Sequence, residues 1–138
     1  MPRAVLDPNV LISAFITPHG ASARILRELR EGAFELITSP MLLRELRTVL
    51  LREKFRPYVS VDEVDAFIGF IRAEGTEVPD PPRSADGLSE DPGDEYLIDL
   101  AREARADALV SGDPHLLKLR SRLAVRSPRE FLESLHPE

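Results

Sequence analysis

The sequence predicts an α/β fold, a three-layer α/β/α sandwich with a mostly parallel central sheet. Short apolar runs typical of buried strands alternate with helical segments from one end of the chain to the other. Such an alternation builds a parallel sheet with helices on both faces. The chain has 138 residues, a length that suits one domain, and we expect residues 1–138 to form it.

The first half of the chain is expected to hold two strands, at residues 3–6 and 34–38, and four helices. Local signals place the helix starts. Ser22 is expected to cap the second helix, and Ser39-Pro40 is a cap followed by a proline at the first helical position. Ser60 and Glu63 have the spacing of a capping box. The four helices are expected over residues 9–16, 22–31, 40–54 and 61–75.

The second half begins with a brief strand at 77–78 and a proline-rich segment, residues 79–93, which we interpret as a loop within the domain. Asp91-Pro92 then opens a helix that is expected to reach about residue 104. Strands are expected at 107–111 and 123–125, with a short helix from Pro114 between them. Ser127 and Glu130 form another capping box, which begins the last helix.

Composition limits the classes of function. The chain has no cysteine, which excludes disulfides and thiolate metal sites. It has no apolar run of the ~20 residues that a membrane span needs, and a charge follows too soon after the first residue for a signal peptide. We therefore expect a cytoplasmic protein. The net charge of −6 is unusual for a protein that binds nucleic acid, unless the acidic side chains gather at one place.

Four acidic residues lie where a parallel sheet places its working site. Asp7 ends the first strand, and Asp113 follows the strand at 107–111. Asp94 is in the first turn of a helix, and Glu45 lies on the helix after the second strand. Ligands bind beyond the carboxyl ends of parallel strands, so these acids could share one edge. Each also has a simpler interpretation, as a helix cap or a solvated side chain.

Clustered carboxylates repel one another unless some are protonated or a cation lies between them. Oxygen ligands without histidine or cysteine favour Mg²⁺ or Mn²⁺. In proteins these ions commonly hold phosphates and activate water. The acidic residues alone therefore indicate phosphodiester hydrolysis.

Four motifs in order along the chain resemble those of the PIN-domain family, and within it the VapC-like toxins of type II toxin–antitoxin systems. They are Val5-Leu6-Asp7-Pro8-Asn9-Val10-Leu11, Thr38-Ser39-Pro40 with Leu43-Arg44-Glu45-Leu46, Asp91-Pro92-Gly93-Asp94-Glu95-Tyr96-Leu97, and Leu109-Val110-Ser111-Gly112-Asp113-Pro114. The closing segment Ser127-Pro128-Arg129-Glu130-Phe131-Leu132 is also similar to the end of such a domain.

The resemblance implies a PIN-like sandwich and an Mg²⁺- or Mn²⁺-dependent endoribonuclease that cleaves single-stranded RNA by metal-activated water, leaving a 5′-phosphate and a 3′-hydroxyl. It also implies a homodimer and a cognate antitoxin protein as partner. The residues it assigns fall into two groups. Catalytic residues are Asp7, Glu45, Asp94 and Asp113, of which Asp7, Asp94 and Asp113 are metal ligands. Supporting residues are Asn9, which would orient Asp7, together with Ser111 and Asp91.

One position departs from the family pattern. The family commonly has threonine or serine between the first aspartate and the asparagine, where this chain has Pro8. Pro8 supports an alternative, a PIN fold kept as a binding module with weakened catalysis. A housekeeping RNA-processing nuclease is a further alternative to a toxin. A haloacid-dehalogenase-like phosphatase is excluded, because Asn9 stands where that chemistry needs an acid.

RNA binding requires positive charge near the acids. Arg44, Arg47 and Arg52 crowd one helix and its exit, and we expect them to contact RNA. The simpler interpretation is a solvated helix face that pairs with neighbouring carboxylates.

Overall fold

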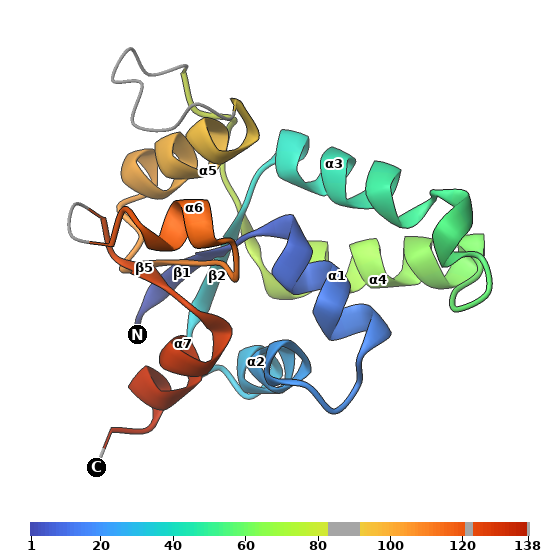
Figure 1. Ribbon diagram of the computed structural model, residues 1–138, viewed down its shortest axis with the longest axis horizontal. Coiled ribbons are helices and arrows are strands. Elements are labelled where there is room, and N and C mark those ends of the chain that lie inside the picture. Colours follow the sequence, from blue (N-terminus) through green and yellow to red (C-terminus); the bar gives the residue numbers. More distant parts are fainter. Residues whose placement is uncertain (83–91, 121–122, 138) are drawn as a thin grey trace.

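A computed structural model describes residues 1–82, 92–120 and 123–137 of the chain (Figure 1). The expected Asp91 cap lies outside these residues. The strands are β1 Arg3–Leu6, β2 Glu35–Thr38, β3 Thr76–Glu77, β4 Ala108–Val110 and β5 Val125–Arg126. The helices are α1 Pro8–Ile16, α2 Ala21–Arg30, α3 Pro40–Leu50, the 3₁₀ turn η1 Glu53–Phe55, α4 Val61–Glu74, α5 Pro92–Glu103, α6 Pro114–Leu117 and α7 Pro128–Leu135.

The five strands form one parallel sheet in the order β3-β2-β1-β4-β5. The chain moves outward from β1 to β2 and β3, and then returns to place β4 and β5 on the other side of β1. The order therefore reverses between β1 and β4. In open α/β sheets the ligand crevice lies at this reversal, outside the carboxyl ends of the strands.

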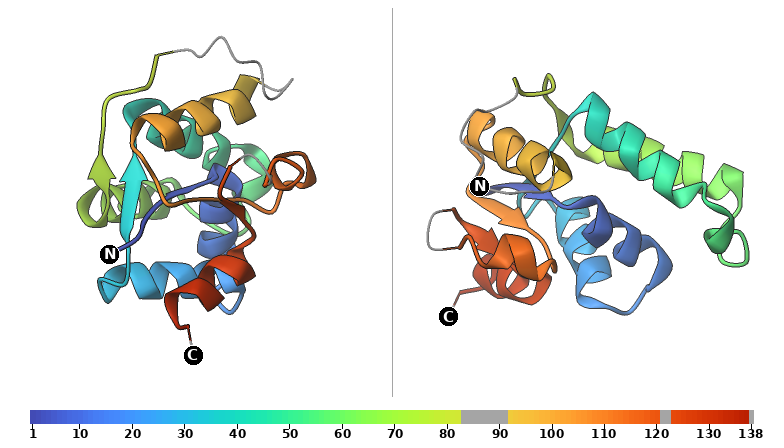
Figure 2. Two further views of the ribbon diagram at one scale, coloured as in Figure 1. Left: turned by 90° about the vertical axis from the view of Figure 1, so that its left-hand side faces the viewer. Right: turned by 45° about the horizontal axis from the view of Figure 1, so that its top comes forward.

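Helices cover both faces of the sheet, which confirms the predicted sandwich. Helix α5 packs against β1 and β4, whereas α7 packs against β4 and β5 and lies beside α2. Figures 1 and 2 show α5 on the opposite side of the sheet from α2 and α7, with α3 and α4 projecting as an antiparallel pair. None of the described helices is long and apolar enough to cross a membrane.

The same local device begins four helices at the carboxyl edge of the sheet. In each, a residue whose side chain caps the helix is followed by a proline at the first helical position, where no backbone N–H is needed. The four pairs are Asp7-Pro8, Ser39-Pro40, Asp113-Pro114 and Ser127-Pro128. Each capping residue comes within three residues of the end of a strand, so strand ends and helix starts lie at one edge.

The core consists of the apolar strand residues and the helix faces that cover them. Leu6, Leu36 and Val110 are buried on neighbouring strands, and Leu46 is buried on α3. Such burial of each large aliphatic side chain contributes about 1.5–3 kcal/mol. The Phe131 ring on α7 packs edge-on against the Phe34 ring, which lies just before β2, with the centroids 5.0 Å apart. This contact joins the helix to the sheet.

Two boundary predictions were wrong. Helix α3 ends at Leu50 rather than near residue 54, because Leu51 caps it and the Arg56 guanidinium donates a hydrogen bond to the Leu50 carbonyl (2.9 Å). Helix α2 begins at Ala21, with Gly20 rather than Ser22 as its cap. The capping boxes at Ser60 and Ser127 are confirmed, and the strand bounds shift by one or two residues.

Gly69 within α4 and Gly75, which caps the end of α4, provide a matched test of this packing. A Cβ atom at Gly75 would lie 2.9 Å from the Ile71 carbonyl oxygen, whereas at Gly69 it would meet nothing within 4 Å. We expect Gly75→Ala to lower the free energy of unfolding by about 1–3 kcal/mol through overpacking. Gly69→Ala should raise it by about 0.4–1 kcal/mol, because it restricts the unfolded chain. Urea unfolding measures both, and equal effects would contradict the described packing.

Candidate active site at the carboxyl edge of the sheet

The centre of the site is a hydrogen-bonded contact between the ends of β1 and β4. Asp7 follows β1 and is only 5% exposed, and Ser111 follows β4 and is fully buried. The Ser111 hydroxyl donates to Asp7 Oδ2 (2.8 Å) and accepts from the Asp113 backbone N–H (3.0 Å). The Asp7 backbone N–H in turn donates to the Val110 carbonyl (2.9 Å). Three of the predicted site residues are thus connected at the point where the strand order reverses.

Asp7 and Asp113 each cap a helix with one carboxylate oxygen. Asp7 Oδ1 accepts the Asn9 backbone N–H (3.0 Å), and Asp113 Oδ1 accepts the His115 backbone N–H (2.9 Å). Both aspartates are therefore helix caps, as the simpler interpretation proposed. A carboxylate has about four acceptor sites, so capping leaves each aspartate able to accept further donors or a cation.

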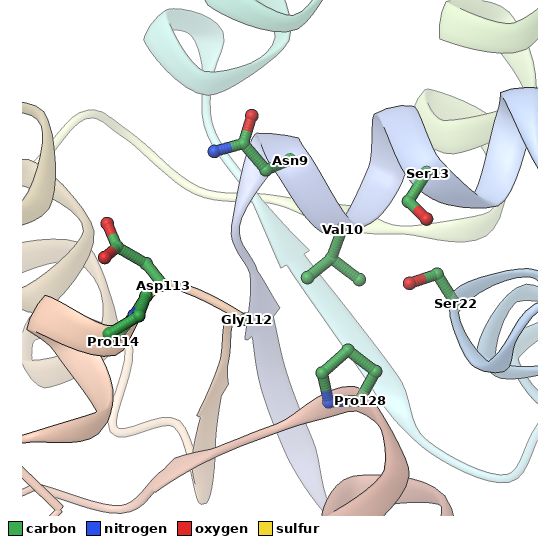
Figure 3. A pocket seen from close by; sticks show the side chains of 8 residues that line it. All are labelled: Asn9, Val10, Ser13, Ser22, Gly112, Asp113, Pro114 and Pro128. Carbon is green, nitrogen blue, oxygen red and sulfur yellow. The ribbon is translucent and has the colours of Figure 1, made fainter.

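Asn9 contacts Asp7 through its backbone rather than through its side chain. Asp7 Oδ1 accepts a hydrogen bond from the Asn9 backbone N–H. The Asn9 side chain instead lines a pocket of about 390 Å³, as Asp113 does (Figure 3). The orienting role that the sequence suggested for the Asn9 side chain is therefore filled by the Asn9 main chain and by Ser111.

The remaining acids lie on α5 and α3. Asp94 is 8% exposed in the first turn of α5, which packs against β1 and β4. Glu45 is exposed on α3, a helix that packs against α1. Within the described part of the chain, no group of three or more histidine, cysteine, aspartate or glutamate side chains is placed so that it could hold a metal ion.

A second hydrogen-bonded group fixes the first turn of α5 to the sheet edge. The Tyr96 hydroxyl donates to Asp80 Oδ1 (2.9 Å) and also contacts the Ser39 hydroxyl. Asp80 Oδ1 accepts the Met41 backbone N–H as well (2.9 Å), at the start of α3. Because Tyr96 is two residues after Asp94, this group restrains the turn that carries Asp94.

The pKa values of Asp80 and Tyr96 differ from those of free side chains. Burial would raise the pKa of Asp80, but hydrogen bonds from Met41 and Tyr96 and the nearby Arg44 guanidinium outweigh it and hold the pKa below its ordinary value. Burial, together with the Asp80 charge, raises the pKa of Tyr96 to about 12. Tyr96 therefore remains a neutral hydrogen-bond donor over the physiological range.

The three predicted RNA-binding arginines differ in their surroundings. Arg47 Nε lies 2.8 Å from Asp65 Oδ1 in an exposed ion pair that joins α3 to α4. Arg44 is exposed near Asp80, and Arg52 is exposed just beyond α3. The simpler interpretation, pairing with a neighbouring carboxylate, thus holds for Arg47.

Comparison with known proteins identifies a family whose pattern matches most of this chain. Residues 3–115 match the family described as PIN domain. The chain belongs to the PIN domain family. Members of this family are in general nucleases, which agrees with a hydrolase site at the carboxyl edge.

Two similar proteins align with nearly the whole of this chain. The chain is 30% identical over 142 residues to the uncharacterized protein MJ1680 of Methanocaldococcus jannaschii, covering 95% of this chain and 90% of that protein. It also resembles a solved chain of VapBC2 from Rickettsia felis, a complex bound to a DNA fragment from their promoter. The TM-score is 0.65 with 15% identity, covering 91% of this chain and 98% of that chain, a likeness that shows the fold.

The donor chemistry of this PIN domain fits a hard divalent cation. Asp7, Asp94 and Asp113 offer carboxylate oxygens, the ligands that Mg²⁺ and Mn²⁺ prefer. Two of these carboxylates, Asp7 and Asp94, are more than nine-tenths buried.

Pro8 has a structural explanation in this PIN domain. It is buried at the first position of α1, where proline is favoured because the fixed φ angle suits the helix and no N–H is needed. The cap bond of Asp7 and the bond from Ser111 both form beside it. Pro8 therefore does not prevent the placement of Asp7.

Sequence reasoning missed Asp80 and Tyr96. Asp80 follows the two-residue strand β3, at the same edge as the ends of the other strands. The rule that selected Asp7 and Asp113, an acid just after a strand, would have selected Asp80 too. It was passed over because the surrounding prolines were interpreted only as loop.

Ser111→Ala should destabilise the PIN domain by about 1–3 kcal/mol, since a buried carboxylate loses a hydrogen-bond donor. Ser134→Ala is the matched control, because the Ser134 hydroxyl bonds only a helix carbonyl at an exposed position among the described residues. That control should change the free energy of unfolding by no more than about 0.5 kcal/mol. Equal effects in urea unfolding would show that the Asp7–Ser111 bond contributes little.

The low pKa of Asp80 predicts a dependence of stability on acid. Its ordinary value is 3.8, and the folded value is lower. The charged form therefore stabilises the fold above pH 3.8, and this stabilisation is lost as the pH falls through the folded pKa. The stability difference between wild type and Asp80→Asn should shrink as the pH drops below 3.8. Tyr96→Phe, which removes one donor, should show a smaller pH effect, and a difference independent of pH would contradict the hydrogen-bonded group.

Proposed function

We propose that this PIN domain is an endoribonuclease that uses Mg²⁺ or Mn²⁺ to cleave single-stranded RNA. The main support is the buried Asp7 carboxylate at the reversal of strand order, bonded to Ser111 and connected through it to Asp113. A nuclease family and an all-oxygen donor set agree with this chemistry.

In this proposal Asp7, Asp94 and Asp113 hold the cation, whose binding draws together carboxylates that the described residues do not place around one ion. When bound, the cation neutralises phosphate charge and makes water a better nucleophile near neutral pH. Ser111 keeps Asp7 oriented by donating to Oδ2, and the cap bonds hold Oδ1 of Asp7 and Oδ1 of Asp113. Such fixed geometry lowers the cost of organising the site during reaction.

Glu45 is the proposed base or positioning group for the attacking water. A bond forms between the water oxygen and phosphorus, and the bond from phosphorus to the 3′-oxygen breaks. The water proton passes to a carboxylate, and the departing 3′-oxygen takes up a proton from the solvent. The products are a 5′-phosphate and a 3′-hydroxyl. Exposure of Glu45 on α3 leaves it accessible to substrate.

We further propose that the protein acts as a toxin that a cognate antitoxin neutralises, and that it forms a homodimer. The support is the fold likeness to a chain of VapBC2, a complex from Rickettsia felis. A small reading frame beside the gene, whose product forms a complex with this chain and stops RNA cleavage, would support the toxin. Cleavage without any such partner would favour an RNA-processing nuclease.

Cleavage of labelled single-stranded RNAs with Mg²⁺, with Mn²⁺ or with EDTA tests the nuclease. Asp7→Asn should reduce cleavage by about 100-fold or more, since loss of even an outer partner of a metal ligand costs roughly 10–100-fold. Asparagine caps helices as well as aspartate does, so the variant should remain folded. Asp62→Asn, an exposed aspartate at the distant start of α4, should cut like the wild type.

A thermal unfolding series with Mn²⁺ separates metal binding from cutting. A ligand that binds only the folded state raises the unfolding temperature. Mn²⁺ should do so for the wild type and for Asp62→Asn, and should do so much less for Asp7→Asn. A folded wild type that neither cuts RNA nor responds to Mn²⁺ would favour the binding-module interpretation.

A further inference from the structure

The pocket beside the acidic residues extends away from them along α1. Asn9 and Asp113 lie at one end of this pocket, and Ser13 and Ser22 lie at the other, with Val10 between (Figure 3). Its volume is about 390 Å³, within the range of small-molecule sites. The site proposed for hydrolysis thus opens into a space that could take a neighbouring part of the substrate.

Ser22 is the unusual residue of this pocket. It is 7% exposed, and its hydroxyl forms no hydrogen bond with the residues that the structure describes. The hydroxyl faces the pocket and points toward Val10 (Figure 3). Because Ser22 lines the pocket, a ligand that enters the pocket could form a hydrogen bond with its hydroxyl.

The pocket lining favours a neutral group over a phosphate. Of the eight residues that line it, Asp113 alone carries a charge. A phosphate would require positive side chains, whereas apolar surfaces and hydroxyls suit a sugar and a base. Pro114 and Pro128 supply apolar surface at the pocket wall.

The first turn of α2 carries Ser22 at one end of the pocket. Gly20 caps α2 without a side-chain hydrogen bond, so the first backbone N–H groups of the helix have no side-chain acceptor there. Such N–H groups bind anions well. A strand of nucleic acid could therefore run from the acids, through the pocket, toward the start of α2.

We propose that the pocket receives the nucleoside joined to the phosphate that is cut, and that Ser22 forms a hydrogen bond with its ribose 2′-hydroxyl. A serine hydroxyl both donates and accepts, as a 2′-hydroxyl does, and the 2′-hydroxyl is the group that distinguishes RNA from DNA. This inference rests on the proposed ribonuclease and names the residue that selects RNA. Ser22 is a specificity residue rather than a catalytic one.

The test measures binding without cleavage. Fluorescence anisotropy in EDTA compares a labelled pool of random single-stranded RNA with the corresponding DNA pool, for wild type, Ser22→Ala and the control Thr48→Ala. Thr48 is an exposed hydroxyl on α3 that does not line the pocket. One lost neutral hydrogen bond corresponds to about a three- to tenfold weaker affinity.

We expect Ser22→Ala to bind RNA about three- to tenfold more weakly, to bind DNA nearly as the wild type does, and so to lose most of the preference for RNA. Thr48→Ala should keep the preference for RNA. Ser13→Phe places a ring in front of Ser22 and should weaken RNA and DNA alike, while circular dichroism checks its fold. An RNA preference that persists in Ser22→Ala, or is absent from the wild type, would overturn the inference.

Cleavage assays on the same proteins separate the two proposals. If the wild type prefers RNA through Ser22 but never cuts it with Mg²⁺ or Mn²⁺, the nuclease proposal fails and the pocket assignment stands. If the wild type cuts RNA and Ser22→Ala keeps the full preference for RNA, the nuclease proposal stands and the pocket assignment fails.

Discussion

The hydrogen bond from the Ser111 hydroxyl to the Asp7 carboxylate is the contact on which the site depends. It joins the ends of β1 and β4, the two strands between which the sheet reverses its order. Ser111 also accepts the Asp113 N–H, so one buried hydroxyl connects two aspartates from distant parts of the chain. Removal of that hydroxyl would leave a buried carboxylate with fewer donors.

Helix capping and metal binding are compatible roles for the same aspartate. Asp7 and Asp113 each use Oδ1 to cap a helix. The cap bond fixes each carboxylate relative to the backbone, and the Ser111 hydroxyl also holds the other oxygen of Asp7. A residue that ends a strand and begins a helix is thus held more rigidly than a side chain within a loop, which suits a metal ligand.

Most of the fold could be predicted from the sequence, because its signals are local. The cap–proline pairs, the capping boxes and the apolar strand runs depend on neighbouring residues only. The end of α3 could not be predicted, since it depends on Arg56 reaching back to Leu50. Ser22 resembles a cap in sequence, yet its hydroxyl faces a pocket. The Asp80–Tyr96 bond joins α5 to the segment after β3, and only the folded chain shows that contact.

The separation of Asp7 from Ser111 along the chain, 104 residues, governs when the site can exist during synthesis. Contacts between distant residues form late, because a long loop must close before they contribute. A ribosome-bound chain that has not yet released β4 can form β1 and β2 but lacks the partner strand and hydroxyl of Asp7. The site can therefore assemble only after most of the polypeptide has left the ribosome.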